Sequence, residues 1–572
     1  MKKFKKSTII VFTLNLVIVI YWLVNQKYFQ VHDTTAGVRI FELTQSLRDG
    51  HFPPRWSKNF GFSLGMPLFQ FYAPFAFYLG TIFNLLGFSI ILSLKTVYLL
   101  TTIIGFSGAY LLGKKLTNHY GGLITATAFT LAPYHALNLY VRGATAEYVA
   151  ISFIPFSIYF AFNLIDKKNQ KNSYLGLVAS LVVIYLSHNV TVLTFIPFWF
   201  CIISLYALSK WKPKELLVSF LAQMHSLLIA AFFLVPAFLQ KNQTRVENIT
   251  QGFSQFNLHF LYFRQLLKPN WGYGGSILGL DDDMSFYLGI DLILLTIFSI
   301  VFLFIKYKQT PSKRNLFKVL PFAIFLISFL LSVIATNFKS TFIWKMIPLT
   351  SFIQFPWRFL GTASFCLAVL AGYSMLSKTL KKNWFIIISI IIILNGRFFR
   401  PSKLIDLAET YDPNPQYVQT YMSGVLPDYL PSGVNWENQK VPQDIIQAQS
   451  DISRRNLPAN SKIIITADTK INIIQNSTNN LLAKITATES DSLIINRYYF
   501  PNWQVSINDQ IDSCQKTKDS RYACQIKPGE SELKVVWSEK GVNAISNLVS
   551  VVSLFALLLI GIGPKLKTKF SK

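Results

Sequence analysis

The feature that most constrains this chain is a series of long apolar runs separated by short polar connections. A helix needs about 20 apolar residues to cross a bilayer, and windows of about 19 residues find such runs. Twelve runs lie at residues 7–24, 93–113, 120–140, 148–165, 173–188, 190–208, 216–238, 286–305, 318–335, 358–376, 383–396 and 541–563. Hydrophobic residues make up 52% of the 572 residues and charged residues only 14%. The sequence therefore predicts a polytopic α-helical membrane protein with about twelve crossings.

The positions of the basic residues orient the predicted helices. Lys and Arg gather in connections that hold few acidic residues, namely 2–6, 114–115, 167–171, 210–214, 306–318, 378–382 and 565–572. With twelve crossings, all of these stretches fall on one side, which is the pattern of cytoplasmic loops. We expect a multi-pass protein of the cytoplasmic membrane with both termini in the cytoplasm. Although the net charge is +27, its placement between apolar runs gives no reason to expect a nucleic-acid partner.

The roles of two apolar segments, one of them outside the twelve runs, have to be assigned. Residues 67–86 are apolar enough to be a thirteenth crossing, but a crossing there would move Lys114 and Lys115 to the opposite side. Their aromatic residues and Pro74 favour an interfacial or re-entrant helix. The first run, residues 7–24, has no small-residue cleavage site after it, so we expect a retained anchor.

The chain divides into three predicted parts. Residues 1–396 form a multi-spanning module, residues 397–540 an extracytoplasmic β-rich domain, and residues 541–572 a final crossing with a basic tail. Alternating segments such as "SKIIITADTKINII" and "ELKVVW", with turn residues such as "KPGE" between them, indicate a sandwich-type fold. Cys514 and Cys524, ten residues apart in this domain, are a candidate disulfide if the domain faces an oxidising exterior.

Three predicted external loops, residues 25–66, 141–147 and 240–285, carry the residues that suit catalysis. In the first loop, Asp33 stands about nine residues past the first crossing, and an ionised Asp, with its reference pKa of about 3.9, can accept a proton. The same loop holds the cations and histidines His32, Arg39, His51 and Arg55. Arg presents a forked donor that matches phosphate oxygens. The alternative is a solvated loop with an incidental acid.

Other charged residues lie at the predicted external ends of later helices. Arg142 and Glu147 stand in "YVRGATAEYV", His188 in "LSHNVT", and Gln354 with Arg358 in "SFIQFPWRFLG". These residues could converge with the first loop on one external cavity. The alternatives are that helix ends tolerate charge simply because the interface is wet, and that the Asn after His188 caps a helix.

Metal ligands give only a weak pattern. Asp281, Asp282 and Asp283 are consecutive, and carboxylates can hold a divalent cation, but three acids in a row lack the spacing of a cation-binding loop. The histidines do not have zinc spacing. Neither a phosphate-binding glycine loop nor a nucleophile elbow is present.

Several stretches carry a family resemblance. The segments "GHFPPRW", "GMPLFQFYAP", "YVRGATAE" and "QFPWRFL" are similar to bacterial membrane proteins described as 6-pyruvoyl-tetrahydropterin-synthase-related, a label that is not in itself a sign of pterin chemistry. The stretch "RYYFPNWQVSIND" with "KPGESELKVVW" resembles YfhO-type membrane glycosylation proteins. The order of features resembles the C-type superfamily of integral-membrane glycosyltransferases.

This resemblance implies a glycosyltransferase. It would move a sugar from a polyprenyl-phosphate donor to an envelope glycan, lipid or protein on the outer face of a bacterial membrane. Asp33 would be the general base, and Glu147 matches the second-loop carboxylate of some relatives. Arg142 and Arg358 would receive the departing phosphate, and the remaining substrate-binding candidates are His32, Arg39, His51, Arg55, His188 and Gln354. Relatives often carry paired acids where His32 precedes Asp33 here, so a divalent cation is left open.

Two other functions remain possible on sequence alone. Twelve crossings also suit a lipid-linked sugar flippase or transporter, although no paired repeats with interrupted helices are evident. A non-catalytic envelope scaffold is the third interpretation. The aromatic residues at 66–78 suit a prenyl tail or sugar faces, or an interfacial aromatic belt.

Overall fold

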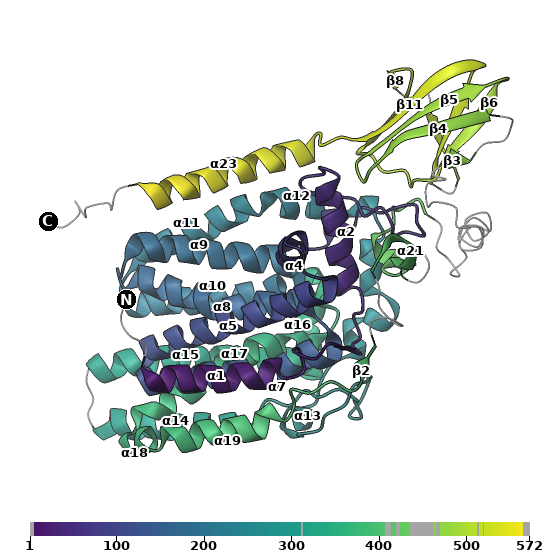
Figure 1. Cartoon of the computed structure of the whole chain (residues 1–572). Coiled ribbons are helices and arrows are strands. Elements are labelled where there is room, and N and C mark those ends of the chain that lie inside the picture. The colour runs from purple at the N-terminus through teal and green to yellow at the C-terminus, as the bar shows by residue number, and fades with distance from the viewer. Residues whose placement is uncertain are drawn as a thin grey trace.

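The molecule consists of a bundle of long helices with a β-sandwich at one end (Figure 1). This computed structural model describes residues 5–309, 313–406, 413–418, 422, 424–434, 463–464, 469–511, 514–518 and 520–563. Helix α1 begins and helix α23 ends at the end of the bundle far from the sandwich (Figure 1).

Each of the twelve predicted crossings contains a helix. These are α1 (Lys6–Ile20), α5 (Ile90–Leu116), α6 (His119–Thr130), α8 (Thr145–Ile165), α9 (Gln170–Ser187), α10 (Asn189–Ser209), α11 (Pro213–Ile229), α14 (Ile290–Gln309), α15 (Lys313–Thr336), α17 (Leu360–Gly372), α19 (Trp384–Gly396) and α23 (Val542–Ile562). In the described part of the chain, seven helical spans are long and apolar enough to cross a membrane. Helix α11 and α12 (Ala231–Leu239), bent by 71°, make an eighth. The prediction of a polytopic helical membrane protein is confirmed.

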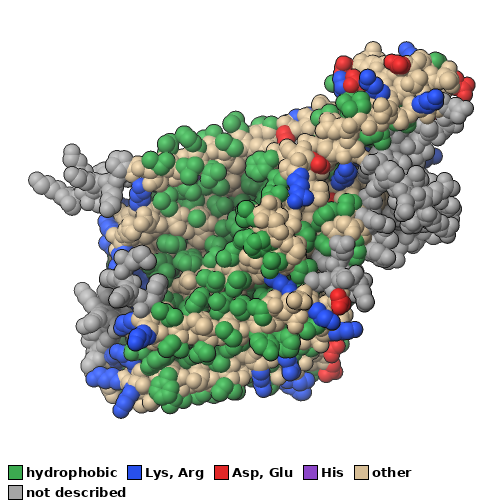
Figure 2. Space-filling model, viewed as in Figure 1, with side chains coloured by type: hydrophobic (Ala, Val, Ile, Leu, Met, Phe, Trp, Pro, Cys, Tyr) green, Lys and Arg blue, Asp and Glu red, His purple; other side chains and the backbone are tan. Residues whose placement is uncertain are grey.

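The surface of the bundle is apolar along its length. Figure 2 shows hydrophobic side chains over the helices and Lys and Arg side chains at the end where α1 begins. On α23, Leu548 and Val551 are each 64% exposed. Such a wide exposed apolar surface is unfavourable in water, and in a bilayer it contacts lipid chains.

Residues 67–86 do not form a long helix. They contain α3 (Leu68–Phe71) and α4 (Phe75–Leu85), and 11 residues in α4 are too few for the roughly 20 that a span needs. Helix α4 packs against α2 (Ala36–Arg48), which runs across the bundle in Figure 1. This geometry agrees with an interfacial helix.

The sandwich has the sheets that the alternating sequence predicts. One sheet has the order β3-β6-β10-β9, and the other has the order β4-β5-β11-β7-β8. The strands are β3 (Ile463–Ile464), β4 (Thr469–Asn476), β5 (Asn480–Ala487), β6 (Asp491–Ile495), β7 (Trp503–Ile507), β8 (Gln510–Ile511), β9 (Cys514–Lys516), β10 (Tyr522–Ile526) and β11 (Gly529–Trp537). All described pairings in both sheets are antiparallel. Inward residues of both sheets, such as Leu481 and Leu493, share one core.

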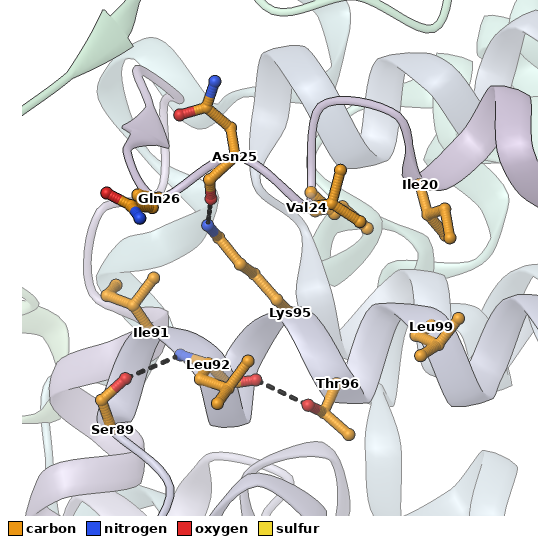
Figure 3. A pocket seen from close by; sticks show the side chains of 11 residues that line it. Ile20, Val24, Asn25, Gln26, Ser89, Ile91, Leu92, Lys95, Thr96 and Leu99 are labelled. Atoms are coloured by element: carbon orange, nitrogen blue, oxygen red, sulfur yellow. Dashed lines mark hydrogen bonds between the residues drawn. The ribbon is translucent and has the colours of Figure 1, made fainter.

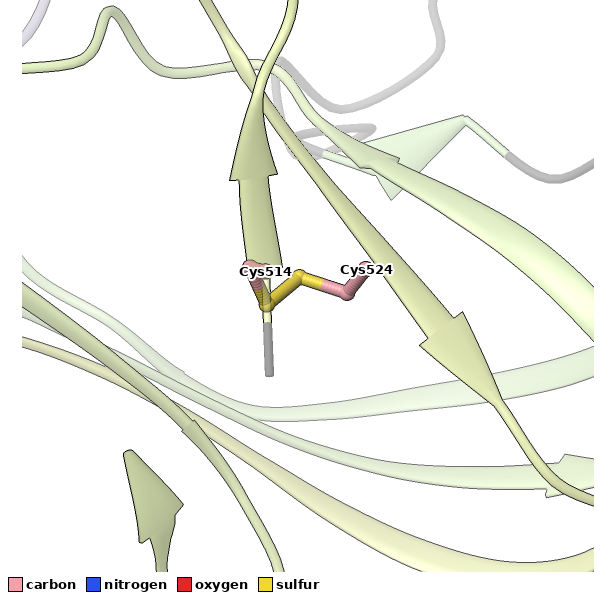
Figure 4. The surroundings of a disulfide bond; sticks show 2 residues. All are labelled: Cys514 and Cys524. Atoms are coloured by element: carbon pink, nitrogen blue, oxygen red, sulfur yellow. A yellow bond between two sulfur atoms is a disulfide. The ribbon is translucent and has the colours of Figure 1, made fainter. Parts of the chain in front are cut away.

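A disulfide joins Cys514 to Cys524 (Figure 4). The two residues face each other across the β9–β10 pair, so the bond links adjacent strands. Cys524 is fully buried in the sandwich core.

The described residues between 397 and 434 belong to the membrane module. Strand β2 (Leu404–Ile405) pairs with β1 (Tyr28–Phe29) of the first loop, and Tyr429 packs against Tyr72 with ring centroids 5.9 Å apart. The sandwich therefore starts later than the predicted boundary at residue 397. The segment 435–462 of that predicted domain lies outside the described residues.

The stretch 49–66 that follows α2 supports the sandwich, and we call it the sandwich seat. The Asp49 carboxylate accepts hydrogen bonds from the Thr478 backbone N–H at 2.6 Å and hydroxyl at 2.5 Å. The Trp56 ring lies 5.4 Å from the ring of Trp503 and 5.7 Å from that of Trp537. The loop 25–66, which the sequence predicts to be external, thus both carries Asp33 and holds the sandwich.

Candidate active site

A cavity of about 410 Å³ collects most of the polar residues selected from the sequence. Its lining includes His32, Asp33, Arg39, Arg142, Glu147, His188 and Arg358. These residues come from three predicted external loops or helix ends and from the start of α10. Three guanidinium groups face two carboxylates here, so the cavity has a surplus of positive charge that suits an anionic substrate.

Asp33 is held by donors on both carboxylate oxygens. Its Oδ1 accepts from the Thr35 backbone N–H at 3.0 Å and from the Thr35 hydroxyl at 2.5 Å, and its Oδ2 accepts from Arg39 at 3.0 Å. Burial raises the pKa of Asp33, but the ion pair with Arg39 and the bonds from Thr35 outweigh this effect, so the pKa lies below its ordinary value. An ionised carboxylate has about four lone-pair sites. Since Asp33 is 31% exposed, it can accept one further hydrogen bond from the cavity.

Main-chain pairing brings Asp33 to the second loop. The His32 N–H donates to the Val141 carbonyl at 3.0 Å, and the Asp33 N–H donates to the Arg142 carbonyl at 2.9 Å. Gly143 follows with φ +65°, and a Cβ there would lie 3.0 Å from the Asp33 carbonyl oxygen. Glycine allows both the left-handed conformation and this close approach.

Glu147 and Arg142 form a buried ion pair. Arg142 donates to the Glu147 carboxylate at 2.8 Å and to Asn138, and the Tyr134 hydroxyl donates to the other Glu147 oxygen at 2.5 Å. The Arg142 guanidinium also lies 4.6 Å from the ring centre of Trp357. Glu147 is 2% exposed, and both its oxygens are occupied, so its contacts orient Arg142.

Arg358 is oriented by a strained turn. Gln354 has φ +64° and ψ −51°, and the Phe355 N–H donates to the Ile353 carbonyl at 2.7 Å, which defines a γ-turn of the rare positive-φ kind. The Gln354 side chain accepts from Arg358 at 2.9 Å and donates to the Ile249 carbonyl at 2.8 Å. Strain of this sort is common at functional sites.

The guanidinium of Arg358 is available to a ligand. Its hydrogen bonds go to the Gln354 amide oxygen and the Ile353 carbonyl, and it forms no ion pair with an acid in the described part of the chain. Its Nε also has no hydrogen-bond partner among those residues. Arg358 therefore retains donors for an anion.

His188 caps helix α10, where the sequence suggested Asn189 as the alternative cap. Its Nδ1 accepts from the Thr191 N–H at 3.2 Å. In a neutral imidazole that accepts through Nδ1, the proton is on Nε2. His188 thus offers an N–H donor in the cavity that it lines.

The cavity does not fit a divalent cation. Described His, Cys, Asp and Glu side chains form no group of three or more that could hold a metal. A cation on Glu147 would have to displace Arg142 or Tyr134, and a cation on Asp33 would lie next to the positive charge of Arg39. Asp282 of the acidic triplet is instead bonded to Gln265 and to the Ile277 N–H.

An apolar groove of about 420 Å³ adjoins the charged cavity. The two share Tyr72, His188 and Arg358. The groove is lined mainly by hydrophobic residues, among them Val192, Leu193, Leu234, Ala237, Phe238, Leu349 and Phe352. Gln354, predicted to bind substrate, lines this groove and not the cavity.

His51 and Arg55 lie in the sandwich seat and not in the cavity. Arg55 is 1% exposed and donates to the Phe232 carbonyl at 2.7 Å and to Asn547 at 2.8 Å. Its Nε lies 3.5 Å from Glu539. The His51 ring lies 5.8 Å from the ring of Trp537. His51 therefore contacts the sandwich, and Arg55 joins the sandwich seat to α12, α23 and the link between β11 and α23.

We expect His51 to make the sandwich seat sensitive to acid. Burial, with Arg55 and Arg497 nearby, lowers the pKa of His51 to about 3 from 6.5. The unfolded chain takes up the proton first, so stability is complete above pH 6.5 and falls as the pH drops toward 3. The loss is about 1.4 kcal/mol per pH unit, or about 2 kcal/mol at pH 5.

The change His51→Phe keeps an aromatic ring against Trp537 and removes the titration. Thermal unfolding of the purified protein at pH 7 and pH 5 measures the effect. The difference between the two pH values should be smaller in the variant by about 2 kcal/mol. An equal difference in both proteins would contradict this role of His51.

Sequence reasoning missed several residues of the cavity. Tyr134 and Asn138 precede Arg142 by eight and four residues, a spacing that places side chains on one helix face. This spacing could have identified them, although the last turns form a π-helix, η1 (Leu137–Arg142). The sequence singles out Tyr72 only as one of the aromatic residues at 66–78, and nothing local predicts that its ring lies 4.0 Å from the Arg39 guanidinium.

The fold and the site define a polytopic membrane protein with a charged cavity, an adjoining apolar groove and a β-sandwich at one end of the helix bundle. The family described as 6-pyruvoyl-tetrahydropterin synthase related domain, membrane protein, matches residues 69–400, which is more than half of the chain. The chain belongs to this family. No curated protein matches the sequence significantly.

Solved structures of the Archaeoglobus fulgidus oligosaccharyltransferase are similar to this chain. The apo form has a TM-score of 0.43 at 11% identity, over 73% of this chain and 59% of that one. The complex with Zn and sulfate has a TM-score of 0.39 at 11% identity, over 76% and 58%. This chain thus spans less than two thirds of the length of these structures.

Proposed function

We propose that the protein transfers a sugar from a polyprenyl-phosphate donor to an acceptor hydroxyl of the cell envelope. The observation that carries this proposal is the continuity of the cavity with the groove. The cavity holds a carboxylate and unpaired guanidinium donors, and the groove next to it is apolar. A lipid-linked sugar phosphate has three parts that match these in order. Its anomeric carbon reacts with a hydroxyl that the carboxylate can deprotonate, its phosphate suits the guanidinium donors, and its long hydrocarbon tail suits the groove.

In the proposed reaction, Asp33 acts as the general base. The acceptor hydroxyl loses its proton to the free lone pair on Oδ2 of Asp33, and its oxygen forms a bond to the anomeric carbon. The bond between that carbon and the phosphate oxygen breaks, the electron pair leaves with the phosphate, and the configuration inverts. The lowered pKa of Asp33 keeps this carboxylate ionised at neutral pH, as a base requires.

Arg358 would bind the departing phosphate. It has donors free of any acid in the described chain, and a cation placed where charge develops lowers the barrier by a few kcal/mol. Arg142, oriented by Glu147, would add a second positive charge, so Glu147 is a positioning residue in this scheme. His188 would donate a hydrogen bond to the donor.

The sidedness of the reaction has independent support. In the view of Figure 2, Lys and Arg side chains lie at the end of the bundle far from the sandwich without acidic neighbours, whereas basic and acidic side chains both lie at the sandwich end. Cytoplasmic ends carry such an excess of basic residues. The disulfide of the sandwich is typical of an oxidising compartment. Both observations favour a cytoplasmic location for the termini and an external location for the cavity.

The groove provides the test of the donor. Ala237 lines it, and Ala237→Trp would fill space that a prenyl tail needs. We expect the variant, in nanodiscs, to have a KM for a long-chain polyprenyl-phosphate sugar at least about tenfold higher than that of the wild type, corresponding to about 1.4 kcal/mol of binding. A donor with two isoprene units should be affected much less.

Leu221→Trp is the matched control, because Leu221 is 54% exposed on α11 and does not line the groove. The measured product is polyprenyl phosphate released in the presence of envelope acceptors. An unchanged KM for the long-chain donor in Ala237→Trp would remove the groove from the proposal. If the wild type released no polyprenyl phosphate from any polyprenyl-phosphate sugar, the proposed transferase function would be wrong.

A further inference from the structure

A separate cavity of about 500 Å³ lies between the end of α1 and the start of α5 (Figure 3). It shares no lining residue with the charged cavity or the groove. One part of its wall is apolar and the other is polar. The lining consists of Ile20, Leu23, Val24, Asn25, Gln26, Ser89, Ile91, Leu92, Lys95, Thr96 and Leu99.

Lys95 is the only charged residue of this lining, and it is buried. The residue is 8% exposed, and its Nζ donates to the carbonyl oxygens of Asn25 at 2.5 Å and Lys27 at 2.9 Å. No acidic side chain of the described chain forms an ion pair with it. The nearby Asp406 pairs with Lys27 at 3.5 Å. Since an ammonium has three donors, Lys95 retains one, and its charge has no acidic partner among the residues that the structure describes.

The ammonium is the group of this lining that suits a phosphate. The Asn25 amide oxygen accepts from the Lys27 N–H at 2.9 Å, and the Asn25 side chain is directed away from Lys95 (Figure 3). Ser89 caps α5 by accepting from the Leu92 N–H at 3.2 Å and lies on the other side of Lys95 (Figure 3). A phosphate at this end of the cavity would therefore form a charge-assisted hydrogen bond with Lys95 alone.

The apolar wall leads away from this polar end along the helices. Leu99 stands one turn beyond Lys95, about 6 Å further into the bundle. Val24 is 73% exposed and Leu92 48% exposed, so the wall is open to the lipid that surrounds the helices. Tyr21, 62% exposed at the end of α1, marks the headgroup level at which aromatic residues gather.

We propose that this cavity binds an anionic phospholipid of the leaflet on the sandwich side. Its phosphate contacts the Lys95 ammonium, and one acyl chain lies along the wall formed by α1 and α5. A free phosphate would use the polar end only. The lipid uses both parts of the lining, which is why we assign the site to a lipid. This inference does not depend on the proposed function.

The lipid also has a structural consequence. Lys95 already fixes the main chain at residues 25–27, which begin the loop that carries Asp33. A phosphate on Lys95 would strengthen this attachment. Binding should therefore raise the thermal stability of the protein.

The test uses the full chain in detergent, with phosphatidylglycerol, phosphatidylcholine or inorganic phosphate added. Native mass spectrometry counts bound lipids, and thermal unfolding gives the change in Tm. We expect phosphatidylglycerol to bind and raise the Tm, and the other two to do so far less. Lys95→Met keeps the length of the side chain and removes the charge, and it should weaken phosphatidylglycerol binding by about tenfold, whereas Lys95→Arg should retain it.

Lys27→Met is the matched control, because Lys27 is exposed and its side chain does not line the cavity. Leu92→Trp is a second variant, for use if Lys95→Met does not fold. Its indole fills the space along the apolar wall and should displace the lipid. Equal binding by the wild type, Lys95→Met and Leu92→Trp would overturn the proposal. An equal shift in Tm with inorganic phosphate would overturn the assignment to a lipid.

Discussion

The variant Asp33→Asn is expected to lose sugar transfer, with kcat lower by about 10² to 10⁴-fold, the range for removal of a general base. The amide can still accept from Thr35, but it is not ionised and cannot take the proton of the acceptor hydroxyl. Asp33 is 31% exposed, so we expect the fold to survive. Release of polyprenyl phosphate, together with thermal unfolding, measures both effects.

Asp406→Asn serves as the control, since Asp406 is 53% exposed and pairs with Lys27. This variant should keep its kcat. If Asp33→Asn turned over the donor at a rate close to that of the wild type, Asp33 would not be the base. A flippase would be favoured if the protein moved the lipid-linked sugar across the membrane without transferring the sugar, and if Asp33→Asn left this movement unchanged. A scaffold would be favoured if the protein had neither activity and Asp33→Asn cells kept a normal envelope.

The variant Arg142→Met is expected to destabilise the protein by about 3 to 5 kcal/mol, the cost of removing one partner from a buried ion pair. Glu147, 2% exposed, would remain charged in the cavity with only the Tyr134 hydroxyl as a donor. Thermal unfolding measures the loss. Transfer should fall as well, because the cavity would lose one of its three guanidinium groups.

The double variant Arg142→Met with Glu147→Met tests whether the loss of stability comes from the charge that a single variant leaves unpaired. Since it leaves no unpaired charge, its loss of stability should be smaller than the sum of the two single losses. Breaking the Lys167–Glu215 pair, whose Lys167 side chain is 58% exposed, should cost less than about 1 kcal/mol. Additive losses for Arg142 and Glu147 would mean that the pair is not coupled.

The helical part of the fold could be predicted because its cause is local. A bilayer requires consecutive apolar residues, and the runs are visible in any short window. The bend between α11 and α12 has no such local mark. The main-chain groups at the bend find their hydrogen-bond partner on α23, far away in sequence. The Ser550 hydroxyl accepts from the Phe232 N–H at 2.7 Å and donates to the Leu228 carbonyl at 3.2 Å. A contact across more than 300 residues of sequence cannot be read from a window.

The same distinction applies to the site. Charges near a membrane are few, so selecting them identified Asp33, Arg142 and Arg358, which line one cavity. The same rule also selected Arg55, which serves the sandwich seat through Asn547 and Glu539. In sequence these residues look alike, and only their distant partners separate them. The conformation of Gln354 also depends on such a partner, the Ile249 carbonyl.

Tyr72, His188 and Arg358 line both the charged cavity and the apolar groove. In a donor bound as proposed, the bond to be broken would lie at the boundary between two solvents. Its cleavage would leave the spent carrier in the hydrocarbon phase and the glycosylated acceptor in the aqueous phase. Partitioning alone would then carry the two products apart, and neither would have to pass the other on leaving.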